Sequence, residues 1–424
     1  MTRPIQRDLL PDSAVIAADG RLSIGGCDLL ELAERFGTPL FVYDEQHLRA
    51  RCREAVAAFG DGVAYAAKAF LCVAMARLAH EEGMSIDVST GGELHVALAA
   101  GVPAERLVLH GNNKSLDELR AARRAGVGLT VVDSFDELER LAALHAEDGL
   151  APKVMLRATP GVEAHTHEFV RTGQLDSKFG FGVTSGDFAS AVARAQDSPA
   201  VEVVGVHMHI GSQVFVADFF HQAVEIVAPW VRELALPELS IGGGLGVAYV
   251  AGEEAPSITE WGTAVVSACR DAGIESRVLA EPGRAIAAQA AVTLYTVGTI
   301  KDVPGVRTYV SVDGGMSDNP RPVLYGSGYE ALLARDAAAE RPRRVTIVGK
   351  HCESGDVLVR DAQVPADLAV GDVLVTPVTG AYGHSMGSNY NKVPRPAVVF
   401  VADGQVREVV RRDSLDDLLR NDVI

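Results

Sequence analysis

Short apolar runs alternate with segments of helical period between residue 41 and about residue 284. The apolar runs are rich in β-branched residues, and the segments between them are rich in Ala, Leu, Glu and Arg. This alternation is typical of repeated strand–helix units around a parallel sheet. The runs expected to form strands are VAYAAK (63–68), SIDVS (85–89), RLVLH (106–110), LTVV (129–132), KVMLR (153–157), VVGVHMH (203–209), ELSIG (238–242) and RVLAE (277–281).

Helical patterns precede the first of these runs and separate the later ones. The first covers residues 44–59, and further clear examples are residues 92–101, 115–126 and 134–149. Strands that alternate with helices eight times predict a (β/α)8 barrel. In such barrels the functional residues gather at the C-terminal ends of the strands.

The helical period ends after residue 285. The remaining chain, residues 286–424, reads as strands separated by turn residues and predicts a mostly β, sandwich- or barrel-like domain. The N-terminal stretch AVIAADGRLSIGG (14–26) contains a hairpin-like Asp-Gly, so residues 1–30 are expected to join that domain. The barrel then covers residues 31–285.

Composition and charge narrow the class of protein. A chain of 424 residues with 48% hydrophobic residues fits two globular domains, and no stretch reads as a membrane span. The N-terminus lacks the apolar segment and cleavage site of a signal peptide, so a cytoplasmic protein is expected. A net charge of -17 would repel a phosphate backbone, which argues against nucleic acid as a partner.

The cysteines give no sign of a disulfide framework or a zinc site. They are odd in number, widely scattered and without any Cys-x-x-Cys pair, so free thiols are expected. They are Cys27, Cys52, Cys72, Cys269 and Cys352.

Polar residues stand at the ends of most predicted strands, where a barrel would carry its active site. Strand seven also runs into GGGLG (242–246), and such a glycine cluster lets backbone N–H groups approach an anion. The polar strand-end residues are Lys68, Asp87, Ser89, His110, Arg157, His207, His209 and Glu281.

Each of these features also has a plain structural reading. Lys68 alone could be an ion-paired barrel lysine, and a glycine cluster is more often a turn than a phosphate site. His207 and His209 alternate on one strand and could face a metal, but the further ligands that a catalytic metal needs have no obvious source. The site is therefore expected to hold no metal.

One cofactor explains the combination of a lysine, imidazoles, a carboxylate and a glycine cluster. Lys68 can form a Schiff base with pyridoxal 5'-phosphate, whose phosphate fits the glycine cluster and whose ring nitrogen fits a carboxylate. Burial within an apolar run would lower the proton affinity of the lysine amine and make it nucleophilic.

Ten short motifs follow one another along nearly the whole chain. They are YAAKA (65–69), DVSTGGE (87–93), PGVEAHTHE (160–168), KFGFG (178–182), HMHIGSQ (207–213), GGGLG (242–246), EPGR (281–284), NPRPVLYG (319–326), HCESGD (351–356) and SNYN (388–391). In this order they resemble the motifs of the diaminopimelate decarboxylases, barrel decarboxylases that use pyridoxal phosphate and are related to alanine racemase (fold type III).

The resemblance implies a role for individual residues. Lys68 would carry the cofactor, His209 would stack on its ring, and Glu281 would pair with the ring nitrogen. The other residues expected to hold the cofactor are Ser212, Gly244, Pro282, Gly283, Arg284 and Tyr382. Those expected to bind substrate are Arg284, Arg321, Tyr325, Glu353 and Tyr382.

The resemblance also makes Cys352 the proton donor to the carbon that loses carbon dioxide. The adjacent Glu353 would favour the protonated thiol by like-charge repulsion if the two side chains approach each other. A buried, purely structural cysteine is the alternative, although KHCESGD is a polar setting for one. The family further implies a head-to-tail homodimer with two shared active sites.

Three functions compete at this point. The first is decarboxylation of meso-diaminopimelate to L-lysine, the last step of lysine biosynthesis. The second is decarboxylation of another basic amino acid or of a carboxylated polyamine, and the third is a non-catalytic homologue that binds pyridoxal phosphate. Arg321 and Arg284 could bind a distal carboxylate that only diaminopimelate has, and Glu353 could bind its ammonium, so the sequence favours the first.

Overall fold

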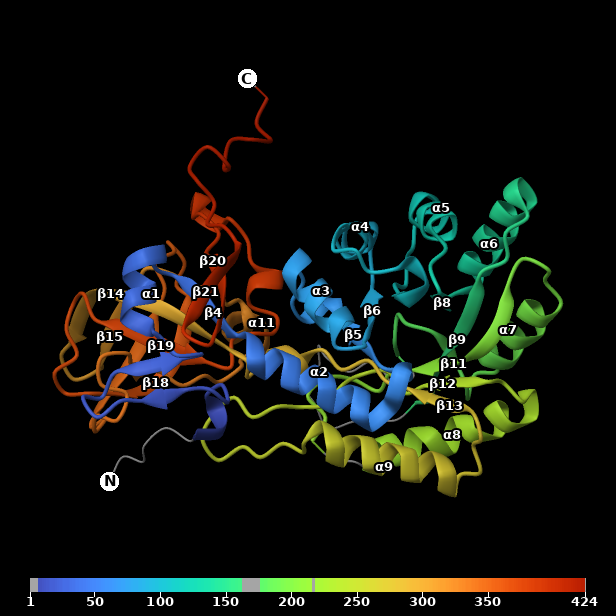
Figure 1. The fold of residues 1–424 in the computed structure, drawn as a ribbon, viewed down its shortest axis with the longest axis horizontal. Coiled ribbons are helices and arrows are strands. Elements are labelled where there is room, and N and C mark those ends of the chain that lie inside the picture. The colour runs from blue at the N-terminus through green and yellow to red at the C-terminus, as the bar shows by residue number, and fades with distance from the viewer. Residues whose placement is uncertain (1–6, 162–175, 216–217, 424) are drawn as a thin grey trace. The chain divides into compact units, whose positions relative to one another are not determined.

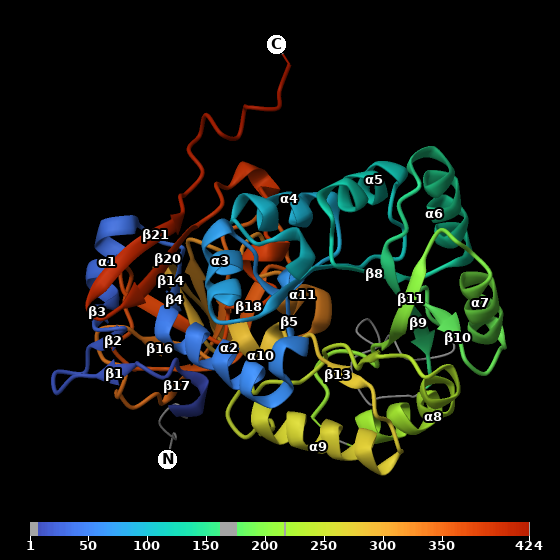
Figure 2. The ribbon, with the colours of Figure 1, turned by 45° about the vertical axis from the view of Figure 1, so that its right-hand side comes forward.

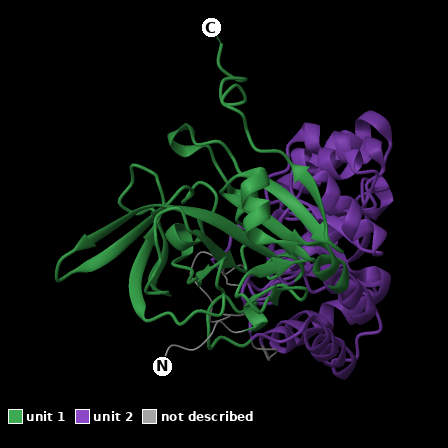
Figure 3. Cartoon of the chain, turned by 60° about the vertical axis from the view of Figure 1, so that its left-hand side comes forward, with its two compact units in different colours: residues 1–50, 247–254, 286–424 green, residues 51–246, 255–285 purple. Residues whose placement is uncertain are grey.

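Two compact units make up the chain in the computed structural model, which describes residues 7–161, 176–215 and 218–423 (Figure 1). One unit comprises residues 1–50, 247–254 and 286–424, and the other comprises residues 51–246 and 255–285 (Figure 3). We call them the β unit and the barrel unit. No helix among the described residues has the length and hydropathy needed to cross a membrane.

The barrel unit contains eight parallel strands in a nearly closed ring, as predicted. Neighbours along the chain are neighbours in the sheet, and β10 (Phe181–Gly182) adds to the edge of β9. The ring strands are β5 (Ala64–Ala66), β6 (Ser85–Val88), β7 (Leu107–Leu109), β8 (Leu129–Val132), β9 (Lys153–Thr159), β11 (Glu202–Met208), β12 (Glu238–Ser240) and β13 (Arg277–Leu279).

Closure of the ring joins the first strand to the last. The backbone N–H of Ala64 donates to Ala280 O at 2.9 Å, and the N–H of Ala280 donates to Gly62 O at 3.2 Å. Apolar side chains form a buried cluster in this unit, among them Ala64, Val131 and Met155. Because side chains fill the interior of such a barrel, substrate can bind only at the ends of the strands.

Helices follow the ring strands one by one, and all are labelled in Figure 1 or Figure 2. Their starts carry local signals: Ser115 and Ser257 each form a capping box with the Glu three residues later. The helices are α3 (Val73–Glu81), α4 (Gly91–Ala99), α5 (Leu116–Ala125), α6 (Phe135–Asp148), α7 (Asp187–Gln196), α8 (Asp218–Leu234) and α9 (Ile258–Asp271). The chain enters the barrel unit through α2 (Glu45–Phe59) and leaves it through α10 (Arg284–Ala287).

The β unit is built on one mixed sheet with strand order β18-β17-β15-β14-β4-β20-β21. Off this path, β19 pairs with β14, and β16 pairs with β19. Its strands are β4 (Leu40–Asp44), β14 (Ala291–Val303), β15 (Arg307–Val312), β16 (Leu332–Leu333), β17 (Arg343–Val348), β18 (Val357–Val364), β19 (Val373–Pro377), β20 (Ala397–Ala402) and β21 (Gln405–Val410). Two short helices, α1 (Leu29–Phe36) and α11 (Arg321–Tyr325), belong to the same unit.

The N-terminal segment is part of the β unit. The hairpin predicted around Asp19-Gly20 forms between β1 (Val15–Ile16) and β2 (Leu22–Ile24), and β3 (Cys27–Asp28) extends it. Leu22 and Ile24 belong to the same hydrophobic cluster as residues of the large sheet.

The division between the units differs from the expected one at residue 30. Residues 31–50 lie in the β unit because β4 pairs antiparallel with β14 and parallel with β20. Residues 247–254 also belong to the β unit, although they lie between two barrel strands in the sequence.

Candidate active site

Lys68 lies just beyond the end of β5, in a 3-10 turn (Ala67–Ala69). The hydroxyl of Tyr65 anchors this turn by donating to Phe70 O at 2.7 Å. Ala67 and Ala69 are buried, but Lys68 itself is exposed. The expectation that the apolar run buries Lys68 is therefore wrong: the strand ends at Ala66, and the side chain of Lys68 in the following turn is exposed.

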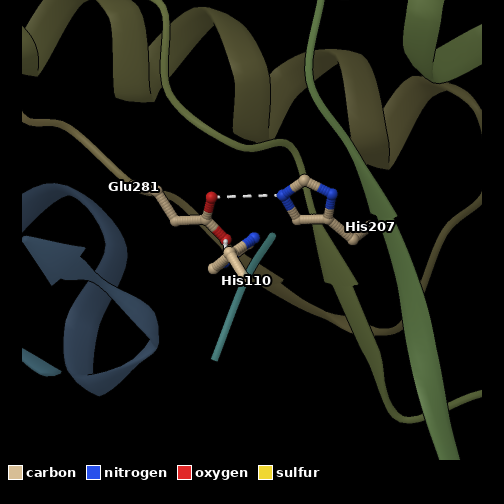
Figure 4. Close-up of side chains that lie close together, drawn as sticks. All are labelled: His110, His207 and Glu281. Atoms are coloured by element: carbon tan, nitrogen blue, oxygen red, sulfur yellow. Dashed lines mark hydrogen bonds and ion pairs between the residues drawn. The ribbon is translucent and has the colours of Figure 1, made fainter. Parts of the chain in front are cut away.

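Glu281 is buried just after β13, and three side chains from other strand ends surround its carboxylate. Figure 4 shows two of them, His110 and His207. Ser240 Oγ donates to Oε1 at 2.8 Å, and His207 Nε2 lies 3.1 Å from Oε2. His110 Nε2 lies 3.4 Å from Oε1 and 3.7 Å from an oxygen of Asp87. Both oxygens of Glu281 are thus fixed in direction.

The electrostatics of this group keep Glu281 ionised. Burial alone would raise the pKa of the Glu281 carboxyl, but the adjacent His110 and His207 outweigh burial and hold that pKa well below its usual range. Burial lowers the pKa of His207 to about 4, so this imidazole is neutral at neutral pH and donates to Glu281 through Nε2–H. Burial acts on His110 in the same direction, but the carboxylates of Asp87 and Glu281 raise its pKa overall.

His209 is half-buried, and the backbone fixes the orientation of its ring. Its Nδ1 accepts a hydrogen bond from the N–H of Gly243 at 3.1 Å, so a neutral ring carries its proton on Nε2. Burial, followed by the positive charges of Lys68 and Arg157, lowers the pKa of His209 well below its usual value. A neutral, fixed imidazole is suited to stacking on a planar ring.

The glycine cluster after β12 is required by backbone crowding. Gly244 has φ +113°, and a Cβ there would collide with Gly211 O. Gly242 has φ +67°, and a Cβ there would lie 2.6 Å from Met208 O. Only glycine allows these backbones to approach one another so closely, and such segments expose N–H groups to anions.

The EPGR segment (281–284) packs against the C-terminal end of β5, the first strand of the barrel. Pro282 O accepts a hydrogen bond from the N–H of Ala66 at 3.2 Å. A Cβ on Gly283 would lie 2.9 Å from the Cβ of Ala66, so glycine is needed for this contact too. Arg284 is buried and donates from Nη2 to Ser212 Oγ at 2.8 Å.

These residues of the barrel unit fit pyridoxal phosphate. They offer an exposed amine, an ionised carboxylate for a protonated ring nitrogen, a fixed imidazole for the ring face, and a hydroxyl with glycine backbone for a phosphate. His110, His207 and Glu281 also have ligand atoms within 4.8 Å of one another. The contacts described above already pair these atoms with each other, and His209 of the His-x-His pair bonds to Gly243 instead.

A second group of expected residues lies in the β unit, around Arg321 at the start of α11. The guanidinium is buried, lies 4.1 Å above the ring of Tyr249, and donates from Nη1 to the hydroxyl of Tyr329 at 2.7 Å. Among the residues that the structure describes, no carboxylate forms an ion pair with it. Arg321 is therefore a buried cation held by two aromatic rings.

The remaining expected residues of the β unit differ in exposure. Tyr325 ends α11 and is half-buried, and Tyr382 is half-buried with the unusual φ of +60°. Cys352 is exposed, so the buried structural alternative is excluded. Glu353 is also exposed, and its Oε1 accepts a hydrogen bond from the N–H of Gly355 at 3.2 Å.

Sequence reasoning missed several contributors. Ser240 is a short polar side chain at the last position of β12, two residues before the glycine cluster, and that position is the signal that could have identified it. Tyr249 and Tyr329 gave no such signal because their role depends on a contact between segments that are far apart in the chain. The motif at residues 160–168 lies, beyond Gly161, outside the described residues.

Comparisons with known proteins agree with this geometry. The pyridoxal-binding domain of pyridoxal-dependent decarboxylases matches residues 45–288. Diaminopimelate decarboxylase of Mycobacterium tuberculosis is 48% identical over 425 residues, and that of Bacillus subtilis is 46% identical over 420 residues; each alignment covers 95% of both chains. The crystal structure of diaminopimelate decarboxylase from M. jannaschii with L-lysine superposes with a TM-score of 0.91 at 34% identity, covering 97% of this chain and 98% of that one.

Proposed function

The chain belongs to the diaminopimelate decarboxylase family of pyridoxal-dependent lyases, and from this premise we propose how its own residues carry out the reaction. The reaction is the decarboxylation of meso-diaminopimelate to L-lysine and carbon dioxide. The cofactor is pyridoxal 5'-phosphate. When bound, it supplies an electron sink for the pair that remains on the α-carbon after carbon dioxide leaves.

The barrel unit would hold the cofactor through the groups already described. Lys68 would bind its aldehyde carbon covalently, and His209 would lie on one face of its ring. The backbone around Gly244 and the hydroxyl of Ser212 would bind the phosphate. The Pro282–Arg284 segment supports that site, and Tyr382 is assigned to the cofactor by the family resemblance.

Glu281 is the observation that carries the proposal. An ionised carboxylate that is buried and fixed by Ser240 and His207 is suited to keeping a proton on a pyridine nitrogen. A neutral carboxyl could not compensate that charge. Because both oxygens are held by their neighbours, Glu281 would need no reorganisation as negative charge develops at the reacting carbon.

Substrate recognition falls to residues that match the two charges at the distal end of diaminopimelate. Arg321 would bind the distal carboxylate, because a planar guanidinium can form two parallel hydrogen bonds with a carboxylate. Glu353 would bind the distal ammonium. Arg284, Tyr325 and Tyr382 complete the proposed substrate contacts.

Cys352 would return a proton to the α-carbon as a general acid. Its exposure is consistent with a thiol that meets a small molecule. We propose further that the protein is a head-to-tail homodimer in which Cys352 and Glu353 reach the barrel of the partner chain. The free thiols support a cytoplasmic location, where cysteines stay reduced.

A substrate panel tests the proposed specificity. Carbon dioxide release is measured for meso-diaminopimelate, its LL isomer, L-lysine, L-ornithine and L-arginine. We expect release from meso-diaminopimelate and none from L-lysine, L-ornithine or L-arginine, because these three lack a distal carboxylate for Arg321. The LL isomer has that carboxylate, so it reports whether the site selects the configuration of the reacting carbon. Turnover of L-lysine or L-ornithine at a comparable rate would favour a basic amino acid decarboxylase, for which Arg321 has no use.

A further inference from the structure

The segment that carries Cys352 is not a strand, and both backbone and side-chain hydrogen bonds hold it. The segment links β17 to β18 over residues 349–356. The backbone N–H of Lys350 donates to Gly314 O at 2.9 Å. Asp356 accepts hydrogen bonds from the N–H of His351 at 3.0 Å and from the N–H of Met316 at 2.7 Å. Gly315 must be glycine here, because a Cβ would lie 2.6 Å from Asp356 Oδ2. Asp356 therefore fixes the C-terminal end of the segment. The backbone N–H of Cys352 bonds to a different residue.

That residue is Asn391, which lies in a separate segment after the short helix at His384–Met386. Its Oδ1 accepts from the backbone N–H of Cys352 at 3.1 Å and lies 3.3 Å from Nδ1 of His351. One amide oxygen thus contacts two successive residues. The same oxygen fixes the proton of His351 on Nδ1, so Nε2 of that ring accepts from Ser317 Oγ at 2.9 Å.

The backbone of Asn391 is adapted to this contact. It has φ 51° and ψ 25°, a left-handed conformation that most residues disfavour and asparagine tolerates. The neighbouring Asn389 holds the same segment differently, since its Nδ2 donates to Val393 O at 3.0 Å and to Asp413 at 3.1 Å. Asn389 anchors the segment, whereas Asn391 connects it to the cysteine.

We propose that Asn391 is a positioning residue for the Cys352 thiol, and that it acts by holding the Cys352 peptide and the His351 ring through one amide oxygen. This inference rests on the proposed role of Cys352 as proton donor. A proton donor must lie within hydrogen-bond reach of the carbon it protonates, so a small displacement of its peptide lowers the rate of that step. The adjacent Glu353 would move with it, and we expect a smaller effect on substrate binding.

The cysteines of this chain make the position of the thiol measurable without turnover. Of the five in the sequence, all within the described ranges, Cys27, Cys52, Cys72 and Cys269 are buried and only Cys352 is exposed. Alkylation of the native holoenzyme with iodoacetamide should therefore label Cys352 first, and peptide mapping verifies this. The rate of alkylation, measured as a function of pH, then reports on the accessibility and the ionisation of the Cys352 thiol alone.

Three variants separate positioning from general stability. Asn391→Gly removes the amide but keeps the left-handed backbone available, and Asn391→Asp keeps an acceptor oxygen while it adds a negative charge. Asn389→Ala is the matched control, because it loses two hydrogen bonds in the same segment but none to Cys352.

For Asn391→Gly we expect kcat to fall on the order of ten- to a hundredfold, KM to change by a smaller factor that reflects movement of the adjacent Glu353, and the alkylation rate at high pH to rise several-fold. For Asn391→Asp the high-pH alkylation rate should match the unchanged protein, while the profile moves to higher pH because a nearby negative charge opposes thiolate formation. Asn389→Ala should leave the alkylation profile unchanged.

The inference is overturned if Asn391→Gly leaves kcat and the alkylation profile unchanged, or if Asn389→Ala changes them equally. The Cys352→Ala variant distinguishes the proposed role of Cys352 as proton donor from the proposed role of Asn391 in positioning it. If Cys352→Ala retains full activity, the proposed role of the thiol fails whatever Asn391 does. If Cys352→Ala is inactive and Asn391→Gly is normal, only the role of Asn391 fails.

Discussion

Lys114 and Arg321 are both buried cations, but their bonding partners differ. The difference distinguishes a structural charge from one that is free to bind a ligand. Lys114 is fully satisfied: it donates to Glu137 at 2.7 Å and to two backbone carbonyls at 2.7 and 2.8 Å. Arg321 is equally buried, yet aromatic rings and a hydroxyl hold it, and none of these neutralises its charge. Burial of a cation without a carboxylate partner among the described residues is costly, which supports the proposal that the distal carboxylate of the substrate pairs with Arg321.

The exposed amine of Lys68 leads to the first prediction. Lys68→Ala should lose the visible absorbance of the bound cofactor and essentially all turnover, because no other residue of the site offers a primary amine. Lys301→Ala, which removes another lysine from the β unit, should change neither. Borohydride reduction followed by peptide mapping checks the assignment directly, and label on any lysine other than Lys68 would contradict it.

Arg321→Lys should weaken substrate recognition and leave the cofactor absorbance intact. An ammonium cannot lie flat on the Tyr249 ring while it forms two hydrogen bonds with a carboxylate. The expected loss in kcat/KM for meso-diaminopimelate corresponds to about 1.5–3 kcal/mol, the value of a charge-assisted hydrogen bond. Arg307→Lys, an exposed site beside Tyr309, is the control. Unchanged kinetics for Arg321→Lys would mean that the distal carboxylate binds elsewhere.

At the scale of elements, the turn that follows β12 combines two constraints on glycine, a left-handed backbone and close packing. Gly244 illustrates both, since its φ is +113° and Gly211 O occupies the space of a side chain. Gly252 shares only the first, because its φ is +91° and no atom lies within 4 Å of the position that a Cβ would take. Comparing the two isolates the effect of crowding.

Gly244→Ala should therefore weaken cofactor binding, while Gly252→Ala should cost only backbone strain, on the order of 1–3 kcal/mol of unfolding free energy. The apparent dissociation constant of pyridoxal phosphate and the thermal unfolding midpoint are measured for both variants. Equal cofactor affinity in Gly244→Ala and the unchanged protein would show that this turn does not contact the phosphate.

The strands also show which parts of the fold can be predicted from the sequence alone. The eight barrel strands were predictable because each is a local apolar run followed by a helical period, and the strand-end rule then indicated Lys68, His209 and Glu281. β4 has the same local pattern but pairs with β14 and β20, about 250 and 350 residues further along the chain. No local pattern encodes such pairing, which is why the expected barrel began too early.

At the scale of the whole molecule, the proposed functional residues divide between two separately packed units. The groups assigned to the cofactor lie mainly in the barrel unit, and Arg321, Cys352 and Glu353 lie in the β unit. In the proposed reaction both sets act on one substrate, and water must be kept from the reacting carbon. A two-fold dimer meets these needs if the β unit of one chain completes the barrel site of the other.

Mixing two inactive variants tests that arrangement. Lys68→Ala and Cys352→Ala are each expected to be inactive, but under conditions that exchange subunits their mixture should recover part of the activity. In a mixed dimer with shared sites, one site contains both substitutions and the other contains neither, so up to a quarter of the sites in a fully exchanged equal mixture would be intact. Native mass spectrometry establishes that mixed dimers have formed. If they form and the mixture stays inactive, Cys352 serves the barrel of its own chain, because a site confined to one chain always carries one of the two substitutions.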